Sequence, residues 1–293
     1  MDYQTGFCSK LCHQKFVQTK TSTFKPPSNS LGYFYKNKLG QAERYVPKIL
    51  KMNKLVVVVL FFAALACQRQ PVSQLEMKLG SHQLVVVRSP SDTSTQAKLQ
   101  RYELSGKRWK AVGQEVSVTV GRSGLAWGRG LHAPQPGQQK REGDGKSPSG
   151  IYAFGKIFGY APASEVHFNM PYVQAADALE CVDDAKSKFY NQLVDNKLTQ
   201  KDWSSSEFMH RSDHQYRWGV TVEHNTSPML PAGGSCIFFH IWRQPAAPTS
   251  GCTAMTEKNL LTLLHWLDAK HSPMLLQVTE ADYPRFKKEF NLP

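Results

Sequence analysis

The chain has 293 residues, of which 41% are hydrophobic and 20% are charged. This composition is typical of a folded globular protein with one large domain or two small ones, and it excludes a chain that is disordered throughout. The formal net charge is +13, but residues 1–66 alone contribute +8, which leaves +5 for residues 67–293. The basic excess therefore lies mostly outside the predicted fold, and it does not indicate a nucleic-acid partner.

The beginning of the chain has the pattern of an exported protein. Residues 1–51 show no sustained hydrophobic period, and we interpret them as an unstructured upstream extension, with translation starting at Met52. Residues 52–66 then combine a short basic start with an apolar run, which is the layout of a secretory signal peptide. The run is too short for a mature transmembrane helix, which needs about 20 apolar residues.

The end of this signal allows two kinds of processing. Leu65-Ala66-Cys67 resembles the lipobox of bacterial lipoproteins, in which the cysteine is lipidated, although Ala64 stands where that motif usually has Leu. Ala64-Leu65-Ala66 also suits an ordinary signal peptidase. We favour a lipoprotein anchored to a membrane through Cys67, in the periplasm or cell envelope. Residues 67–81 would be a tether and residues 82–293 the folded domain.

Three of the six cysteines remain in the folded domain, namely Cys181, Cys236 and Cys252. This number is too small for a disulfide scaffold. Cys181 and Cys236 could form a bridge in an oxidising compartment or remain buried thiols. Cys252 is then the odd cysteine, and an unpaired thiol in an exported protein requires an explanation.

The folded domain has the pattern of a mainly β protein. Short apolar or alternating runs separated by turn residues predict antiparallel strands. We expect strands at 83–88, 99–104, 108–112, 115–120, 148–154, 216–223, 235–242 and 274–278. Residues 174–218 are a long insertion, for which we expect short helices near 185–193 and 205–209. A further helix is predicted after Thr256, a good N-cap, and another at 281–290.

Two stretches resemble a phosphate-binding loop and a zinc site, but each lacks a residue that its motif requires. Gly143-Asp144-Gly145-Lys146-Ser147 has Lys140 where a phosphate loop needs its first glycine, so we interpret it as a chain of turns. His210 and His214, with the aspartates nearby, lack the glutamate of the zinc-protease arrangement. The sequence therefore predicts neither a metal nor a cofactor.

His240 and Cys252 are the residues most suited to chemistry. Alternation along 235–242 places His240 on a buried strand, and Cys252 follows Gly251 shortly before the predicted helix. A helix N-terminus and a nearby histidine both favour a thiolate, so we expect a lowered pKa for Cys252. Taken singly, His240 could be a core histidine and Cys252 a buried thiol.

Their combination with Ser250-Gly251-Cys252-Thr253-Ala254-Met255 resembles the signature of the L,D-transpeptidase (YkuD-type) catalytic domain. Other stretches resemble an exported branch of that family. They are residues 121–132, 143–152, 180–184 and 234–240. The chain departs from the family at Ala254, where many members carry an arginine. The residue that holds a substrate carboxylate is therefore open, with Arg243 and Arg217 as candidates.

The resemblance implies a β-sandwich whose groove holds the Cys/His pair and binds peptidoglycan stem peptides. Cys252 would be the nucleophile, His240 the general base and acid, the Gly251 amide part of an oxyanion hole, and Ser250 part of the turn that meets substrate. His224 would orient the substrate or the base, or be an ordinary structural histidine. The acylated cysteine would transfer the stem to an acceptor amine. A carboxypeptidase with the same dyad and a noncatalytic wall-binding lipoprotein remain alternatives.

Overall fold

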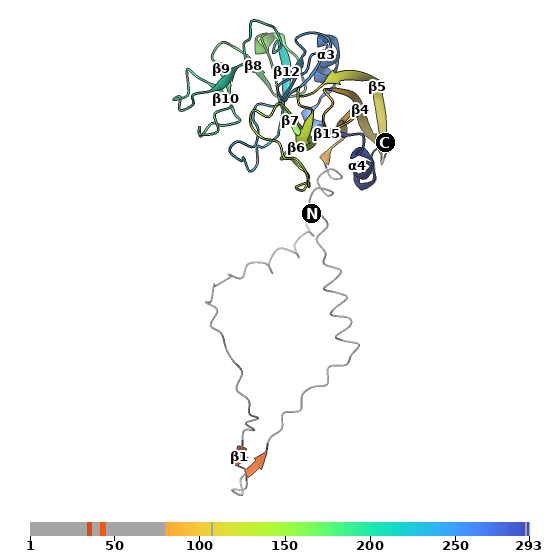
Figure 1. Ribbon diagram of the computed structural model, residues 1–293, viewed down its shortest axis with the longest axis vertical. Coiled ribbons are helices and arrows are strands. Elements are labelled where there is room, and N and C mark those ends of the chain that lie inside the picture. The colour runs from red at the N-terminus through yellow and green to blue at the C-terminus, as the bar shows by residue number, and fades with distance from the viewer. Residues whose placement is uncertain (1–33, 37–41, 45–79, 107, 291, 293) are drawn as a thin grey trace, which may run out of the picture. The chain divides into compact units, whose positions relative to one another are not determined.

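The computed structural model describes residues 34–36, 42–44, 80–106, 108–290 and 292 (Figure 1). The chain divides into two units, Met1–Cys67 and Gln68–Pro293. In the first unit the described residues form a hairpin of β1 (Phe34–Lys36) and β2 (Ala42–Arg44). The predicted start at Met52, the signal peptide, the lipid anchor at Cys67 and residues 67–79 of the tether lie outside the described residues.

The second unit is built on one large sheet that closes on itself. Along the sheet the strand order is β12-β13-β14-β5-β4-β3-β15-β7-β6, and β12 also pairs with β7, so the path returns to its start. The strands are β3 (Gln83–Ser89), β4 (Gln96–Ser105), β5 (Arg108–Thr119), β6 (Leu125–Trp127), β7 (Ser147–Gly159), β8 (Tyr172–Gln174), β12 (Trp218–Val222), β13 (Phe238–Ile241), β14 (Thr253–Met255) and β15 (Met274–Thr279). The predicted β-rich class is confirmed, and its main sheet is barrel-like.

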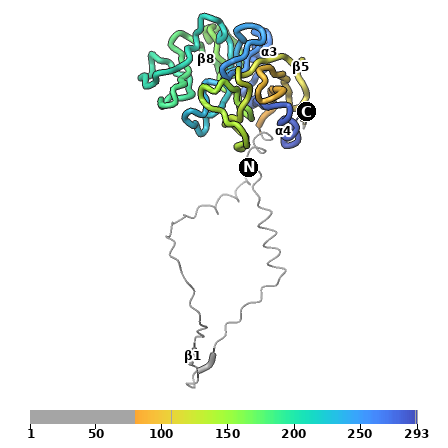
Figure 2. Tube along the Cα trace, viewed as in Figure 1, coloured from red at the N-terminus to blue at the C-terminus, as the bar shows by residue number. Residues whose placement is uncertain are grey.

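Strand β3 shows why the apolar runs fold this way. Val85 and Val87 belong to the core on one face of the sheet, which also contains Leu260 and Leu264 of helix α3 (Glu257–Trp266). Leu84 and Val86 face the other way, into a second core that includes three side chains of helix α4 (Tyr283–Phe290). Burial on both faces explains a continuous apolar run in place of alternation. Figure 2 shows α4, in blue, beside the orange part of the chain.

The predicted strands at 108–112 and 115–120 form one strand, β5. Gly113 has a φ of +67°, and the pairing register with β4 shifts between Leu99 and Arg101. A residue without Cβ adopts this left-handed conformation readily, so the glycine bends the strand without ending it.

The helix after Thr256 is confirmed. The Thr256 hydroxyl accepts a hydrogen bond from the Asn259 N–H at 3.2 Å, and Leu260, Leu263 and Leu264 are buried. None of the described helices is long and apolar enough to cross a membrane. The described part of the chain also contains two short 3₁₀ helices, at Ala163–Glu165 and Ala269–His271.

The two helices predicted in the long insertion are wrong. The insertion forms a three-stranded sheet in which β9 (Leu179–Val182) lies between β10 (Leu193–Asp195) and β11 (Ser206–Phe208). Asn191 has a φ of +62°, which interrupts a helix before β10. Backbone pairing of β11 with β9 and a disulfide between Cys181 and Cys236 hold the insertion in this form. Of the two outcomes open for these cysteines, the structure has the bridge.

Candidate active site

A cavity of about 700 Å³ brings the main sequence-predicted site residues together. Its walls come from the Cys252 turn, from β13, from the 140s loop and from the insertion. The lining residues are Arg122, Lys140, Glu142, Gly143, Asp183, Glu207, Arg211, Gln215, Tyr216, Ser235, Cys236, Ile237, His240, Arg243, Pro248, Thr249, Ser250, Gly251 and Cys252. Cys252, His240, Gly251, Ser250 and Arg243 therefore all line the same cavity.

Cys252 immediately precedes the internal strand β14. The next residues form β14, which pairs in parallel with β13 and antiparallel with β5. The Cys252 carbonyl oxygen accepts hydrogen bonds from the hydroxyls of Ser147, at 2.9 Å, and Thr249, at 2.6 Å. These contacts fix the turn that presents the cysteine to the cavity.

The Cys252 thiol is held between two backbone groups. Its Sγ accepts a hydrogen bond from the Phe238 N–H at 3.3 Å and lies 3.5 Å from the Cys236 carbonyl oxygen, to which the S–H donates. The residue is only 7% exposed. Burial raises the pKa of Cys252, and the nearby Glu207 carboxylate raises it further. The thiol is therefore neutral in this state.

The predicted lowering of the Cys252 pKa is thus wrong for this structure. Residues 253–255 form β14, and helix α3 starts only at Glu257. The field of a helix terminus falls off within about one turn, so it is weak at the thiol. Desolvation by the surrounding core residues is the larger effect.

His240 is set up as a neutral base. Its Nδ1 lies 2.8 Å from the Ile241 carbonyl oxygen, which can only accept, so Nδ1 carries the hydrogen and Nε2 has a free lone pair. Burial lowers the pKa of His240 to about 4. The ring packs edge-to-face against Tyr216, with centroids 5.2 Å apart. A fixed, unprotonated imidazole is the kind of group that acts as a general base, and His240 lines the same cavity as the Cys252 thiol.

The Gly251 N–H already donates a hydrogen bond within the turn. It donates a hydrogen bond to the Thr249 hydroxyl at 3.1 Å. To bind an oxyanion, this N–H would have to leave that oxygen. The Cys252 N–H is the other amide of the turn suited to the role.

Arg122, Glu207 and Tyr216 are among the cavity residues that were not identified from the sequence. Arg122 donates from Nη1 to the Ser250 hydroxyl at 3.1 Å, although the two are 128 residues apart. Glu207 accepts a hydrogen bond from the Tyr216 hydroxyl at 2.5 Å. No local motif marks these residues, because long-range pairing of strands and loops brings them to the cavity.

Two sequence-predicted binding residues lie elsewhere. His224 is buried and does not line the cavity, because its Nδ1 accepts from the Arg129 N–H and its Nε2 is 3.1 Å from the Gly233 carbonyl oxygen. Arg217 also lies outside the cavity lining and pairs with Glu257 at 2.9 Å. Of the two arginines considered for a substrate carboxylate, only Arg243 lines the cavity. Ala254, two residues after Cys252, is fully buried in β14.

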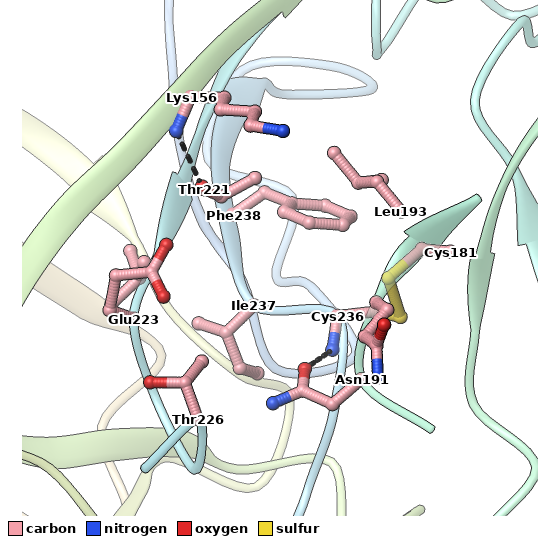
Figure 3. Close-up of a pocket in the computed structure, with 12 residues that line it drawn as sticks. Lys156, Cys181, Asn191, Leu193, Thr221, Glu223, Thr226, Cys236, Ile237 and Phe238 are labelled. Atoms are coloured by element: carbon pink, nitrogen blue, oxygen red, sulfur yellow. Dashed lines mark hydrogen bonds between the residues drawn. A yellow bond between two sulfur atoms is a disulfide. The ribbon is translucent and has the colours of Figure 1, made fainter. Parts of the chain in front are cut away.

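A smaller cavity of about 250 Å³ shares Cys236 and Ile237 with the first (Figure 3). Figure 3 shows the Cys181–Cys236 disulfide at its edge and the Asn191 side chain reaching the Cys236 N–H, a hydrogen bond of 2.9 Å. Asn191 and the disulfide, which line this second cavity, therefore hold Cys236, whose carbonyl oxygen contacts the Cys252 thiol.

The aspartates and histidines of the insertion do not converge on a metal site. His210 pairs with Asp177, and Arg211 pairs with Asp213. Within the described part of the chain, no three His, Cys, Asp or Glu side chains are arranged to hold a metal ion.

The family model of the L,D-transpeptidase catalytic domain, YkuD, matches residues 84–275. The chain belongs to this family. No curated protein matches it. Among solved structures, the chain is similar to the helical cell shape determining protein Pgp2 (K307A mutant) from Campylobacter jejuni, with 12% identity and a TM-score of 0.36. That alignment covers 71% of this chain and 53% of the other, so the chain spans about half the length of Pgp2.

The YkuD match includes both elements of the candidate site. Residues 84–275 contain β13 with His240 and the turn with Cys252, and they also contain the whole insertion. The resemblance seen in the sequence is confirmed at the level of the family.

Proposed function

We propose that the protein is a peptidoglycan L,D-transpeptidase in which Cys252 is the nucleophile and His240 the general base. The observation that carries this proposal is that the Cys252 thiol and a neutral, Nδ1-anchored His240 line one cavity in a YkuD domain. The substrate would be a stem tetrapeptide whose third residue is a diamino acid and whose last residue is D-Ala.

The first half-reaction forms a thioester. His240 Nε2 takes the thiol proton while the sulfur attacks the carbonyl carbon of the third residue. The tetrahedral oxyanion then collapses and the C–N bond to D-Ala breaks. His240 returns its proton to the leaving amine. The products are free D-Ala and a stem joined to Cys252.

The second half-reaction transfers the stem. An acceptor amine attacks the thioester carbonyl and gives a proton to His240. The C–S bond breaks, and the sulfur leaves as a thiolate that recovers the proton from His240. With water as the acceptor, the same steps would make the enzyme a carboxypeptidase.

This function requires that the domain reaches the cell wall. We propose that residues 52–66 direct export and that a lipid on Cys67 anchors the protein in the cell envelope. The signal-like pattern and the peptidoglycan substrates of the family support this location.

The test is mass spectrometry of the full chain after incubation with a defined tetrapeptide muropeptide. We expect loss of D-Ala, a stem adduct on Cys252, and joined stems when an acceptor amine is present. Cys252→Ala should form none of these. Trimmed stems without joined ones would identify a hydrolase, and the absence of both adduct and product from the wild type would refute the enzymatic function.

A further inference from the structure

Glu207 is a carboxylate in the wall of the candidate active site, and the nearby positive charge of Arg211 lowers its pKa without forming an ion pair with it. It lies on β11 opposite Cys181, whose disulfide to Cys236 connects this strand to the segment that contacts the Cys252 thiol. The Tyr216 hydroxyl donates to its Oε2, and no described cation forms an ion pair with it. Arg211, on the same wall, already donates to Asp213 from Nε at 2.9 Å.

The negative charge on Glu207 disfavours formation of the Cys252 thiolate. A negative charge near a thiol disfavours the thiolate, and Glu207 contributes to the raised pKa of Cys252 after burial itself. Burial also raises the pKa of Glu207. A cation beside Glu207 would lower the pKa of Glu207 and that of Cys252. Lys140 and Arg211 already oppose this effect of Glu207 at the thiol, and a further positive charge beside Glu207 would reduce it again.

We propose that Glu207 binds the free ammonium group on the diamino acid of the donor stem, and that this pairing promotes attack by Cys252. The inference rests on the proposed function, because it assigns a role in recognising that substrate. The donor would then help to activate its own nucleophile, and stems without the ammonium group would bind but react slowly.

The charges of the cavity fit such a donor. Its walls carry Arg122 and Arg243, neither of which forms an ion pair with a described residue, and these suit the carboxylates of a stem. Glu142, Asp183 and Glu207 supply the opposite charge, and of these Glu207 lies on strand β11 of the insertion. An ion pair formed in a partly buried cavity is stronger than one in bulk water, because the effective dielectric constant is lower.

Single-turnover acylation without an acceptor tests the donor alone. Two donors are compared, one with the free amine of the diamino acid and one with that amine acetylated. In the wild type the free-amine donor should acylate Cys252 roughly ten- to a hundredfold faster, the loss typical of a charged hydrogen bond. This comparison needs no variant and is independent of folding defects.

Glu207→Gln should remove the preference. The variant should react more slowly than the wild type with the free-amine donor and at least as fast with the acetylated donor, because the opposing charge is gone. Glu223→Gln makes the same change on a carboxylate that lines the smaller cavity, and it should keep the wild-type preference. Tyr216→Phe removes the hydroxyl that contacts Glu207 but keeps the carboxylate, so the preference should remain.

Several outcomes would overturn the role of Glu207 without affecting the proposed function. Equal acylation by both donors in the wild type would do so, as would a preference retained in Glu207→Gln. A preference lost equally in Tyr216→Phe would show that Glu207 acts only by positioning the ring beside His240. An effect confined to the transfer step would assign Glu207 to the acceptor amine. Absence of any acylation would instead refute the function itself.

Discussion

The thiol of Cys252 and the main chain of Cys236 are joined by a hydrogen bond, with Sγ 3.5 Å from the Cys236 carbonyl oxygen. Cys236 has a φ of +54°, a conformation that costs a non-glycine residue about 1 kcal/mol or more. The Asn191 side chain accepts its N–H at 2.9 Å, and the disulfide fixes its side chain to Cys181. The insertion therefore holds the backbone that positions the thiol.

Removal of this disulfide should lower both stability and activity. The bridge closes a loop over a sequence separation of 55 residues, and loop-closure entropy alone predicts a loss of about 4 kcal/mol in the Cys181→Ala/Cys236→Ala variant. Urea unfolding measures this loss, and single-turnover acylation should slow as the Cys236 carbonyl becomes mobile. Cys252→Ala keeps the disulfide and serves as the control for the unfolding measurement. A double variant that unfolds at the wild-type midpoint would contradict this prediction.

On the acid side of the pH–rate profile, activity should be lost only at an unusually low pH. The pKa of His240 is lowered to about 4 by burial, and the neutral ring is the base. The base therefore remains active as the pH falls through 6 and 5 and is lost only as the pH approaches 4. Measurement of kcat/KM for acylation against pH reports this value for the free enzyme. An acid limb near 6.5, the usual pKa of a histidine, would show that His240 is not the base or is solvated.

The sequence predicts what local rules determine. The helix after Thr256 is confirmed because its cap and its apolar stripe are close together in the chain. The strand predicted from Ser235 begins only at Phe238, because Cys236 adopts a left-handed conformation that alternation cannot reveal. The predicted helices of the insertion fail for a related reason, since pairing with β9 and the disulfide override local preference.

The residues of the candidate site likewise fall into those that local sequence patterns identify and those that only the fold brings together. His240 and Cys252 were identified because a histidine followed by a Gly-Cys motif resembles the family signature, and in this chain the two residues lie twelve apart. Arg122 and Glu207 were missed because folding brings them in from distant parts of the chain. The error on the Cys252 pKa has the same origin, because the burial that raises it is a tertiary property.

Arg122 should hold a carboxylate of the donor stem. It lines the cavity beside Ser250 and forms no ion pair with a described residue. Arg122→Gln should raise KM about tenfold or more for donors with a free terminal carboxylate, with less effect on amidated donors. Steady-state kinetics with both donors provides the test. Arg217→Gln is the matched control, because Arg217 pairs with Glu257 outside the cavity lining, and an equal effect there would rule out a specific role for Arg122.

Asp144 should stabilise the loop that supports the Cys252 turn. Its carboxylate accepts from Lys140 Nζ at 2.6 Å and from the Lys146 N–H at 2.9 Å, and the next residue, Ser147, donates to the Cys252 carbonyl oxygen. The side chains of Lys140 and Asp144 are only 4% and 15% exposed. The glycine-rich stretch that resembles a phosphate loop is thus a turn built around a buried ion pair.

Asp144→Ala should therefore cost about 3 kcal/mol in the free energy of unfolding, because the buried Lys140 ammonium loses its partner. Acylation of Cys252 should slow as well, since the loop also holds Ser147 against the cysteine turn. Urea unfolding and single-turnover acylation measure the two effects. Glu165→Ala, at an exposed carboxylate in a 3₁₀ helix, should change stability by no more than about 0.5 kcal/mol. If both variants unfold alike, the Lys140–Asp144 pair does not stabilise the site.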